Sequence, residues 1–394
     1  MSSHPFITVA TITQSFSNVN TQKINTIYMV GTKGSGSITN NSIQEVATLE
    51  DFDTIVGPNA VSRPSYKFLR AIDNAVPVYF VAGLSNNASP TLADNLIAGF
   101  LTLSKNVRLV PGIVVCPEVA EMTSGITSVF DAAQNLVSNS LLNWQYFHNL
   151  TVASDDKTKA IAEAALLNSP QGHSAAFYGY GKDSDGNNIP LAIVAAARTT
   201  FLNRSRRGYF SSAAFQETIP FSSVDEKYLP KWYIGVDEYT ELNNKNINTI
   251  FLDGDGINRK SYTICGARTL SKDVSWRYQN TRYAANNIFN RCQEVLKPFL
   301  FLPTDVASTP SKTEVSGFQE VLTNADILLA LKVLLDDLAA EGAFSTPPIL
   351  QDGTQPDQYT IIPTRLLDGN IAITIELYIV QTREKIALTF VKKG

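Results

Sequence analysis

Short apolar runs alternate with amphipathic stretches through the first two thirds of the chain. Runs typical of buried strands lie at 24–31, 77–83, 109–117, 147–154 and 175–181. Helical patterns lie at 50–57, 65–75, 92–104, 125–140 and 155–168. Further strands are expected within 247–265. An order of strand, helix and strand predicts an α/β domain with a mainly parallel sheet.

The pattern changes after Gly266, where a long helix is predicted over 275–297. A second strong helical pattern spans 324–342 and ends at a glycine, which is common just past a helix C-terminus. Strict alternation of apolar residues then predicts a strand over 371–380. This later part of the chain therefore reads as a smaller α+β unit.

Two predicted strands have no hairpin partner nearby in the sequence. The first covers residues 6–13, where Phe6, Ile7, Val9 and Ile12 alternate weakly with Thr and Ser. The second is the short strand 386–390, near the C-terminal end. Both must pair with a distant segment or with another chain.

Composition narrows the class of protein. Only 17% of the 394 residues are charged and the net charge is −4, which argues against general nucleic-acid binding. A surface so poor in charge suits burial against partners as well as water. The three cysteines are far apart in the sequence, so a disulfide framework or zinc site is not expected. No signal peptide or membrane-spanning run is recognised, and folding in the cytoplasm is expected.

Motifs that carry chemistry are incomplete. The stretch 31–36, GTKGSG, follows a strand but lacks the order of a phosphate loop, so a flexible β–α connection is expected. The stretch 183–188, DSDGNN, lacks the other positions of a calcium loop and reads as an exposed turn. A catalytic triad could draw on His148 or His173 with Ser154, but no nucleophile elbow is present. We therefore expect no catalytic residue, no cofactor and no metal.

Arginines gather in the segment 264–291, at Arg268, Arg277, Arg282 and Arg291. Phosphate binding is disfavoured because no glycine-rich loop accompanies them. Pairing within the chain and pairing with a neighbouring subunit both stay open. Arg282 shares the polar helix face with asparagines, so it is expected to point outward. Arg268 and Arg277 are expected to be partly internal.

Several motifs together resemble contractile tail sheath proteins. The resemblance rests on 253-DGDGIN-258, 264-ICGARTLSKD-273, 276-WRYQNTRY-283, 335-LDDLAAEGAF-344 and 369-GNIAITIELYIVQTREKIALTF-390. Near the N-terminus it rests on 28-YMVGTKGSG-36, 52-FDTIVG-57 and 77-PVYFVAG-83. Cys265 stands where family members often have Trp, and the proline usual between the last two strands is absent. These departures leave the subfamily open.

The resemblance implies an α/β sheath domain at 23–265, called subtilisin-like for its fold alone, and an inner α+β domain at 266–380. It implies extended arms at 1–22 and 381–394, each adding a strand to neighbouring subunits. The arm residues are then Phe6, Ile7, Val9, Ile12, Ile386, Leu388 and Phe390. Contacts of the inner domain fall to Arg268, Trp276, Arg277 and Arg282.

The function implied is that of a structural subunit, without enzymatic activity, of a virion tail assembled in the bacterial cytoplasm. Copies of the chain would form stacked hexameric rings in a helical sheath around the tail tube, between the baseplate and the tail terminator. Neither nucleic-acid contact nor membrane insertion is implied. The alternatives are a bacterial contractile injection system, pyocin-like or secretion-type, and, with less support, a subtilisin-like hydrolase or a nucleotide-binding protein.

Overall fold

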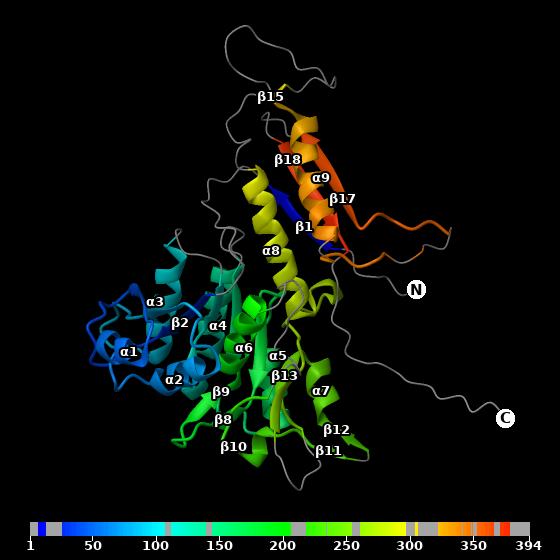
Figure 1. Ribbon diagram of the computed structural model, residues 1–394. Coiled ribbons are helices and arrows are strands. Elements are labelled where there is room, and N and C mark those ends of the chain that lie inside the picture. The colour runs from blue at the N-terminus through cyan, green and yellow to red at the C-terminus, as the bar shows by residue number, and fades with distance from the viewer. Residues whose placement is uncertain are drawn as a thin grey trace, which may run out of the picture.

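The computed structural model describes residues 7–12, 26–106, 112–138, 144–205, 218–233, 235–253, 261–296, 304–305, 322–340, 342–347, 349, 353–365 and 371–378. These residues form an α/β domain and a slimmer C-terminal unit that rises from it along one long helix (Figure 1). None of the helices in these ranges has the length and apolar content needed to cross a membrane.

An eight-stranded sheet forms the centre of the α/β domain, in the order β14-β13-β7-β6-β5-β2-β4-β3. Its members are β2 (Thr26–Gly31), β3 (Ser42–Glu45), β4 (Val78–Ala82), β5 (Gly112–Val115), β6 (Gln145–Asn149), β7 (Ser174–Tyr178), β13 (Ile247–Asp253) and β14 (Ser261–Cys265). The strands from β13 to β4 are parallel, and β14 and β3 close the two ends antiparallel. The predicted, mainly parallel sheet is confirmed.

Helices cover both faces of this sheet. They are α1 (Leu49–Ile55), α2 (Arg63–Ile72), α3 (Leu92–Ser104), α4 (Ile126–Val137), α5 (Lys157–Ala165), α6 (Leu191–Ser205) and α7 (Glu238–Asn244). Thr48 and Thr91 start α1 and α3 with reciprocal capping boxes, and Asp156 caps α5. Such caps satisfy backbone N–H groups that the first helical turn leaves unpaired.

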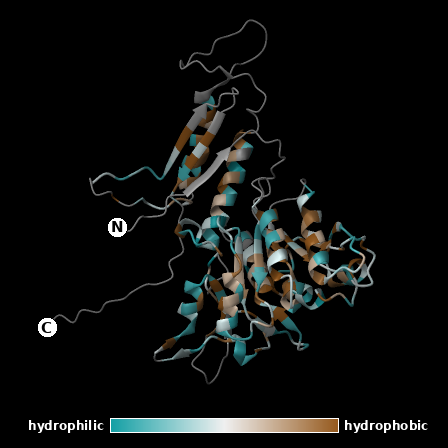
Figure 2. Cartoon of the chain, turned by 180° about the vertical axis from the view of Figure 1, so that it is seen from behind, coloured by the Kyte–Doolittle hydropathy of each residue, from teal (hydrophilic) through white to brown (hydrophobic). Residues whose placement is uncertain are grey.

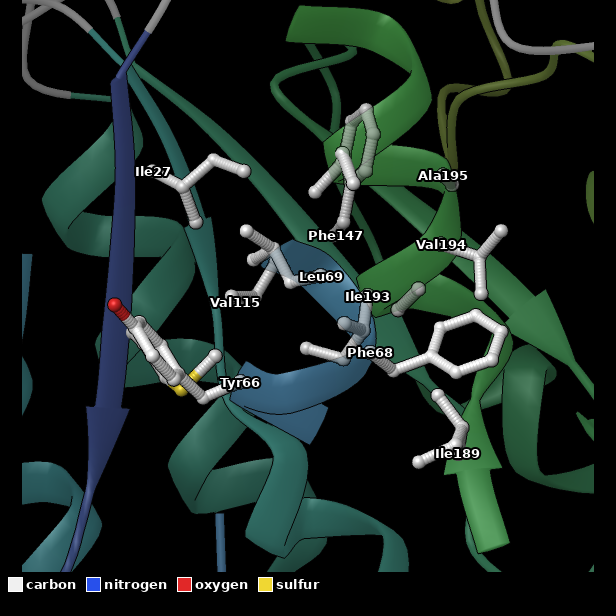
Figure 3. Close-up of a cluster of buried hydrophobic side chains, with 14 of the residues drawn as sticks. Ile27, Tyr66, Phe68, Leu69, Val115, Phe147, Ile189, Ile193, Val194 and Ala195 are labelled. Carbon is white, nitrogen blue, oxygen red and sulfur yellow. The ribbon is translucent and has the colours of Figure 1, made fainter. Parts of the chain in front are cut away.

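Two apolar cores lie on opposite faces of the sheet. One contains side chains of α1, α2 and α6, including Tyr66, Leu69 and Ile193, packed on Ile27 and Val115 of the strands (Figure 3). The other is built on α3 and α4. Because both faces are covered, the inner strands β2, β4, β5, β6 and β7 are almost wholly buried. Brown, apolar segments lie within this domain in Figure 2. Smaller elements are η1 (Pro117–Glu121), β8 (Tyr180–Lys182), β9 (Asn188–Pro190), β10 (Ser223–Val224), η2 (Glu226–Tyr228), β11 (Trp232–Tyr233) and β12 (Val236–Asp237).

The C-terminal unit packs a three-stranded sheet against two helices. These elements are η3 (Val274–Trp276), α8 (Gln279–Leu296), α9 (Asn324–Ala340), β17 (Tyr359–Arg365) and β18 (Ile371–Leu377), with the short pair β15 (Thr304–Asp305) and β16 (Leu322–Thr323). Ile373, Ile375 and Leu377 of β18 are buried in its core, which confirms the alternation. Gly342, with φ +79°, follows the end of α9 as expected.

The first of the unpaired strands is β1 (Ile7–Ile12), which pairs antiparallel with β18 of the same chain. The sheet order is β1-β18-β17, so this strand near the N-terminal end pairs with a strand near the C-terminal end of the sequence. A single chain does not test exchange between subunits, and exchange stays a prediction. Phe6 and the segment 386–390, with Ile386, Leu388 and Phe390, lie outside the described residues.

One expectation about the glycine stretch was wrong. This stretch was expected to be a flexible connection from a strand to a helix, but it connects β2 to the strand β3. Hydrogen bonds hold its backbone in place: the N–H groups of Gly34 and Gly36 donate to the Val56 carbonyl at 2.8 and 3.1 Å. Asn59 Oδ1 accepts from the Ser35 N–H at 2.8 Å. The turn at 183–188 is confirmed as an exposed turn, in which Asp183 Oδ1 accepts from the backbone of Asp185 and Asn187.

Candidate functional site

The arginine-rich segment forms the joint between the α/β domain and α8. After β14, Gly266 adopts φ +97°, where an added Cβ would come within 2.3 Å of Asn243 Oδ1. The chain then folds back on itself: the Thr269 N–H donates to the Arg277 carbonyl, and the Gln279 N–H donates to the Ala267 carbonyl, at 2.7 and 2.8 Å. The α8 helix therefore starts directly beside the end of the sheet.

Asn248 of β13 holds this joint in place through hydrogen bonds of its side chain. It is completely buried, and its Nδ2 donates to the carbonyls of Ala176 and Arg268, both at 2.8 Å. Its Oδ1 accepts from the Arg268 N–H at 2.8 Å. A single side chain thus ties the backbone after β14 to the neighbouring strand β7. Nothing in the sequence pattern singled out this asparagine.

Arg282 lies in the interior of the joint, and the expectation that it points outward is wrong. Its side chain is only 7% exposed, and its guanidinium carbon lies 4.5 Å from the centre of the Trp276 ring. Its Nε donates to Asn286 Oδ1 at 2.7 Å, and Nη1 donates to the Gln171 carbonyl at 3.3 Å. Burial lowers the pKa of Arg282 to about 9. The polar helix face was read as solvent-exposed, whereas here it packs against the α/β domain.

The residues around Arg282 leave room for its guanidinium to stack on the Trp276 ring. Gly172 adopts φ +71°, and a Cβ there would come within 2.6 Å of the Trp276 carbonyl oxygen. His173 follows it, and burial together with the nearby Arg282 charge holds its pKa well below its usual range. Within the residues that the structure describes, no carboxylate lies within ion-pair distance of Arg282. Trp276 and Arg282 therefore act as a packing pair.

Arg268 and Arg277 agree better with expectation. Arg268 is buried, with its guanidinium carbon 5.8 Å from the centre of the Tyr278 ring. Arg277 is half-buried, and its carbonyl accepts from Thr269. The contacts that the structure gives for Arg268 and Arg282 lie within the chain. Pairing of these arginines with another subunit stays a prediction.

The helix α8 is polar and yet enclosed along its first twelve residues, 279–290. Tyr283 packs into the core of the α/β domain, while Ala284 and Ile288 pack into the core of the C-terminal unit. The buried atoms Asn280 Oδ1 and Asn287 Nδ2 have no hydrogen-bond partner among the described residues. A helix shared between two cores in this way links the two bodies mechanically.

The triad considered from the sequence does not form. Ser154, Glu163 and His148 do come together, but the carboxylate stands in the middle: it accepts from Ser154 Oγ at 2.5 Å and lies 3.9 Å from His148 Nε2. All three side chains are buried. Burial alone would raise the pKa of Glu163, but the His148, Ser154 and Thr151 contacts lower it below its usual value. The Ser154 hydroxyl therefore donates to a carboxylate and not to the His148 imidazole, so these residues do not have the order of a Ser-His-Asp triad.

The position where nucleotides bind in many α/β proteins is filled by the protein itself. In open α/β sheets, ligands bind at the carboxyl ends of strands where successive connections leave toward opposite faces. Here the buried Glu118, which follows β5, occupies that place. Its two carboxylate oxygens accept from the N–H and the hydroxyl of Thr32, both at 2.7 Å. Burial raises the pKa of Glu118 to about 7. The loop donors that a phosphate would need are already used.

No group of three or more His, Cys, Asp or Glu side chains within the described residues is placed to hold a metal ion. Cys116, Cys265 and Cys292 are buried free thiols.

Neither a protein-family model nor a curated protein matches the sequence. Solved structures, in contrast, match the whole chain at low identity. A chain of the anti-feeding prophage (AFP) baseplate has a TM-score of 0.67 at 15% identity, covering 100% of both chains. The contracted AFP helical sheath has a TM-score of 0.65 at 15% identity, covering 100% of this chain and 97% of the other. The contracted PVC sheath of an extracellular contractile injection system has a TM-score of 0.64 at 15% identity, covering 100% and 98%.

The chain thus has the fold of contractile sheath proteins over its full length. The resemblance inferred from the sequence motifs is confirmed at the level of the fold. The joint at 266–290, with Trp276 and Arg282 at its centre, lies within the length of chain that these matches cover.

Proposed function

We propose that the chain is a structural subunit of a contractile sheath, which polymerises helically around an inner tube and contracts to drive the tube through a cell envelope. One observation carries this proposal: the similarity to the contracted AFP and PVC sheaths covers all of this chain and nearly all of theirs. A match confined to the α/β domain would point only to a widespread fold. Here the joint and the C-terminal unit are included.

The domain assignment belongs to the same proposal. Residues 23–265 form the subtilisin-like sheath domain, 266–380 the inner domain, and 1–22 and 381–394 the arms. The strand β1 supports the idea of exchange, because it sits alone at the edge of a sheet built otherwise from residues 359–377. An identical strand from a neighbour could take its place with the same backbone hydrogen bonds.

Further partners follow from the same role. They are other copies of the chain in stacked hexameric rings, the tube protein, the baseplate and the tail terminator. The subunit would assemble in the bacterial cytoplasm and end in the tail of the particle. Baseplate and sheath structures of AFP support contact with both kinds of assembly.

An enzymatic role receives no support from the two places where it would be sought. The carboxylate of Glu118 fills the ligand position of the sheet, and Glu163 separates Ser154 from His148. We propose that contraction draws instead on burial and charge pairing between subunits in the contracted lattice.

A bacterial contractile injection system is a second candidate beside a phage tail. The AFP and PVC matches favour it, because the PVC sheath is described as part of an extracellular contractile injection system. The two candidates share the same subunit chemistry. The neighbouring genes separate them, since a phage tail is encoded beside capsid and packaging genes.

Electron microscopy of the purified protein tests the proposal. We expect hollow tubes or rings under negative stain, and their number should rise with protein concentration. A matched variant lacking residues 1–12 should remain folded by circular dichroism and form fewer tubes. Monomers alone, at every concentration and ionic strength tested, would argue against a sheath.

A further inference from the structure

A small hairpin exposes two aromatic side chains to solvent. It consists of β11 and β12, paired antiparallel, with Trp232 opposite Asp237 and Tyr233 opposite Val236. Trp232 is 71% exposed and Tyr233 is 62% exposed. Gly235 at the turn adopts φ +83°, and a Cβ there would meet no atom within 4 Å. Large aromatic side chains are more often buried, and they dominate the binding energy of many interfaces.

The base of this hairpin is held in place before any partner arrives. Glu238 Oε2 accepts from the Lys231 N–H at 2.7 Å, and the Glu238 N–H donates to the Lys231 carbonyl at 3.1 Å. Lys157 of α5 lies 3.6 Å from the Glu238 carboxylate and 2.7 Å from that of Glu241. A hairpin clamped to α5 and α7 loses little conformational freedom on binding.

A complementary surface lies at the other end of the domain. The hairpin leads into α7, which packs on β13 near one end of the sheet, whereas α3 packs against β2, β4 and β3 at the opposite end. Figure 1 shows the two on opposite flanks of the α/β domain. The outward side of α3 carries Leu101, which is 52% exposed, between the half-buried Ile97 and the exposed Lys105.

We propose that the aromatic hairpin of one subunit docks onto the outer side of α3 of a second copy of the chain. Trp232 and Tyr233 would pack on Leu101 and Ile97, and the exposed Asp237 at the base of the hairpin would face Lys105. Because the two surfaces differ and lie at opposite ends, the contact is head-to-tail and repeats from subunit to subunit. Such a contact is what a ring or helical lattice needs, whereas a closed pair would use one surface twice.

The small size of the hairpin fits a polymer better than a stable dimer. Two aromatic side chains cover far less than the roughly 1,200 Å² of a typical specific interface, so one contact alone would be weak. In a lattice the contact recurs at every subunit and adds to the other interfaces. The inference rests on the proposed sheath function and names one contact within it.

Disulfide trapping tests this contact directly. The variant carrying both Trp232→Cys and Leu101→Cys should give a ladder of covalent oligomers when assembled particles are oxidised. The three native cysteines are buried and should not contribute. A matched control combines Trp232→Cys with Leu166→Cys, a position that is also exposed but directly follows the C-terminal end of α5. We expect no ladder from the control.

A second pair of variants measures the strength of the contact. Trp232→Ser with Tyr233→Ser should leave the unfolding of the isolated subunit unchanged, because both side chains are exposed. We expect the protein concentration needed for assembly to rise by about tenfold, a factor that corresponds to about 1.4 kcal/mol per contact. Val61→Ser, at another exposed apolar position, should leave assembly unchanged.

The outcomes separate this inference from the sheath proposal. If wild-type protein forms tubes but the Trp232 and Leu101 cysteines give no ladder, the hairpin contact is wrong and the sheath function stands. Binding of the hairpin to lipid vesicles, with assembly unaffected by the serine variants, would also overturn it. If the wild type forms neither rings nor tubes, the sheath proposal itself fails.

Discussion

Replacing Asn248 by alanine should loosen the joint between the α/β domain and α8. The substitution removes the acceptor of the Arg268 N–H and both donors of the Asn248 amide. The Arg268 carbonyl keeps the Gln279 side chain as a donor at 3.1 Å, so it is not orphaned. The buried Arg268 N–H would lose the Asn248 acceptor.

The size of the effect follows from those contacts. Leaving a buried donor without its acceptor costs about 1–3 kcal/mol, and each further hydrogen bond lost adds about 1 kcal/mol. We therefore expect Asn248→Ala to lower the free energy of unfolding by about 2–4 kcal/mol. Asn248→Asp keeps the acceptor but turns a carboxylate toward two carbonyl oxygens, so it should cost at least as much.

Urea denaturation followed by circular dichroism measures the global change, and hydrogen exchange at Arg268 and Leu270 reports the local one. Asn244→Ala, at an exposed position in α7, is the matched control and should shift stability by less than about 0.5 kcal/mol. If Asn248→Ala behaved like the control, the joint would not depend on this side chain.

Three further predictions concern other features of the molecule. Burial raises the pKa of Glu118 from 4.5 to about 7, so between these pH values the folded state binds one proton more than the unfolded state, and wild-type stability falls as the pH rises. Glu118→Gln should therefore raise the melting temperature at pH 8 more than at pH 5, by the equivalent of about 2–3 kcal/mol. Equal effects at both pH values would contradict this. Gly172→Ala should lower the free energy of unfolding by about 1–3 kcal/mol, because φ is +71° and the added Cβ would approach the Trp276 carbonyl oxygen. In Gly186→Ala the added Cβ meets no atom, so this variant should lose only the stability that φ +83° costs an alanine. Equal melting temperatures for the two variants would contradict this prediction. Deletion of 382–394 should leave a folded monomer that does not polymerise, and normal tubes from that variant, seen by electron microscopy, would rule out a need for the C-terminal arm.

Much of the α/β domain could be predicted because its strands are buried on both faces and read as apolar runs. The helix over 92–104 has the predicted bounds. The strand β17 was not predicted, because its apolar run is short: Pro363 follows Ile361 and Ile362, and the next residues are polar. Because β17 lies at the edge of its sheet, where proline is tolerated, Pro363 is compatible with a strand.

The interior of the joint was harder to predict. A helix face rich in Asn and Gln normally faces water, and nothing local shows that α8 is enclosed by two cores. The burial of Arg282 and the role of Asn248 depend on residues more than a hundred positions away, such as Gln171, or on neighbouring strands. Such contacts come from tertiary packing, which sequence periodicity does not report.

We propose that this chain forms a layer around a tube and that the layer shortens. The turn at 183–188 offers a place for a short epitope tag, because Gly186 faces open space. Immunogold labelling of tagged particles from producing cells should decorate the whole length of the extended tail, and the decorated layer should become shorter and wider after triggering. Label confined to the baseplate, or a decorated length that does not change on triggering, would contradict the account.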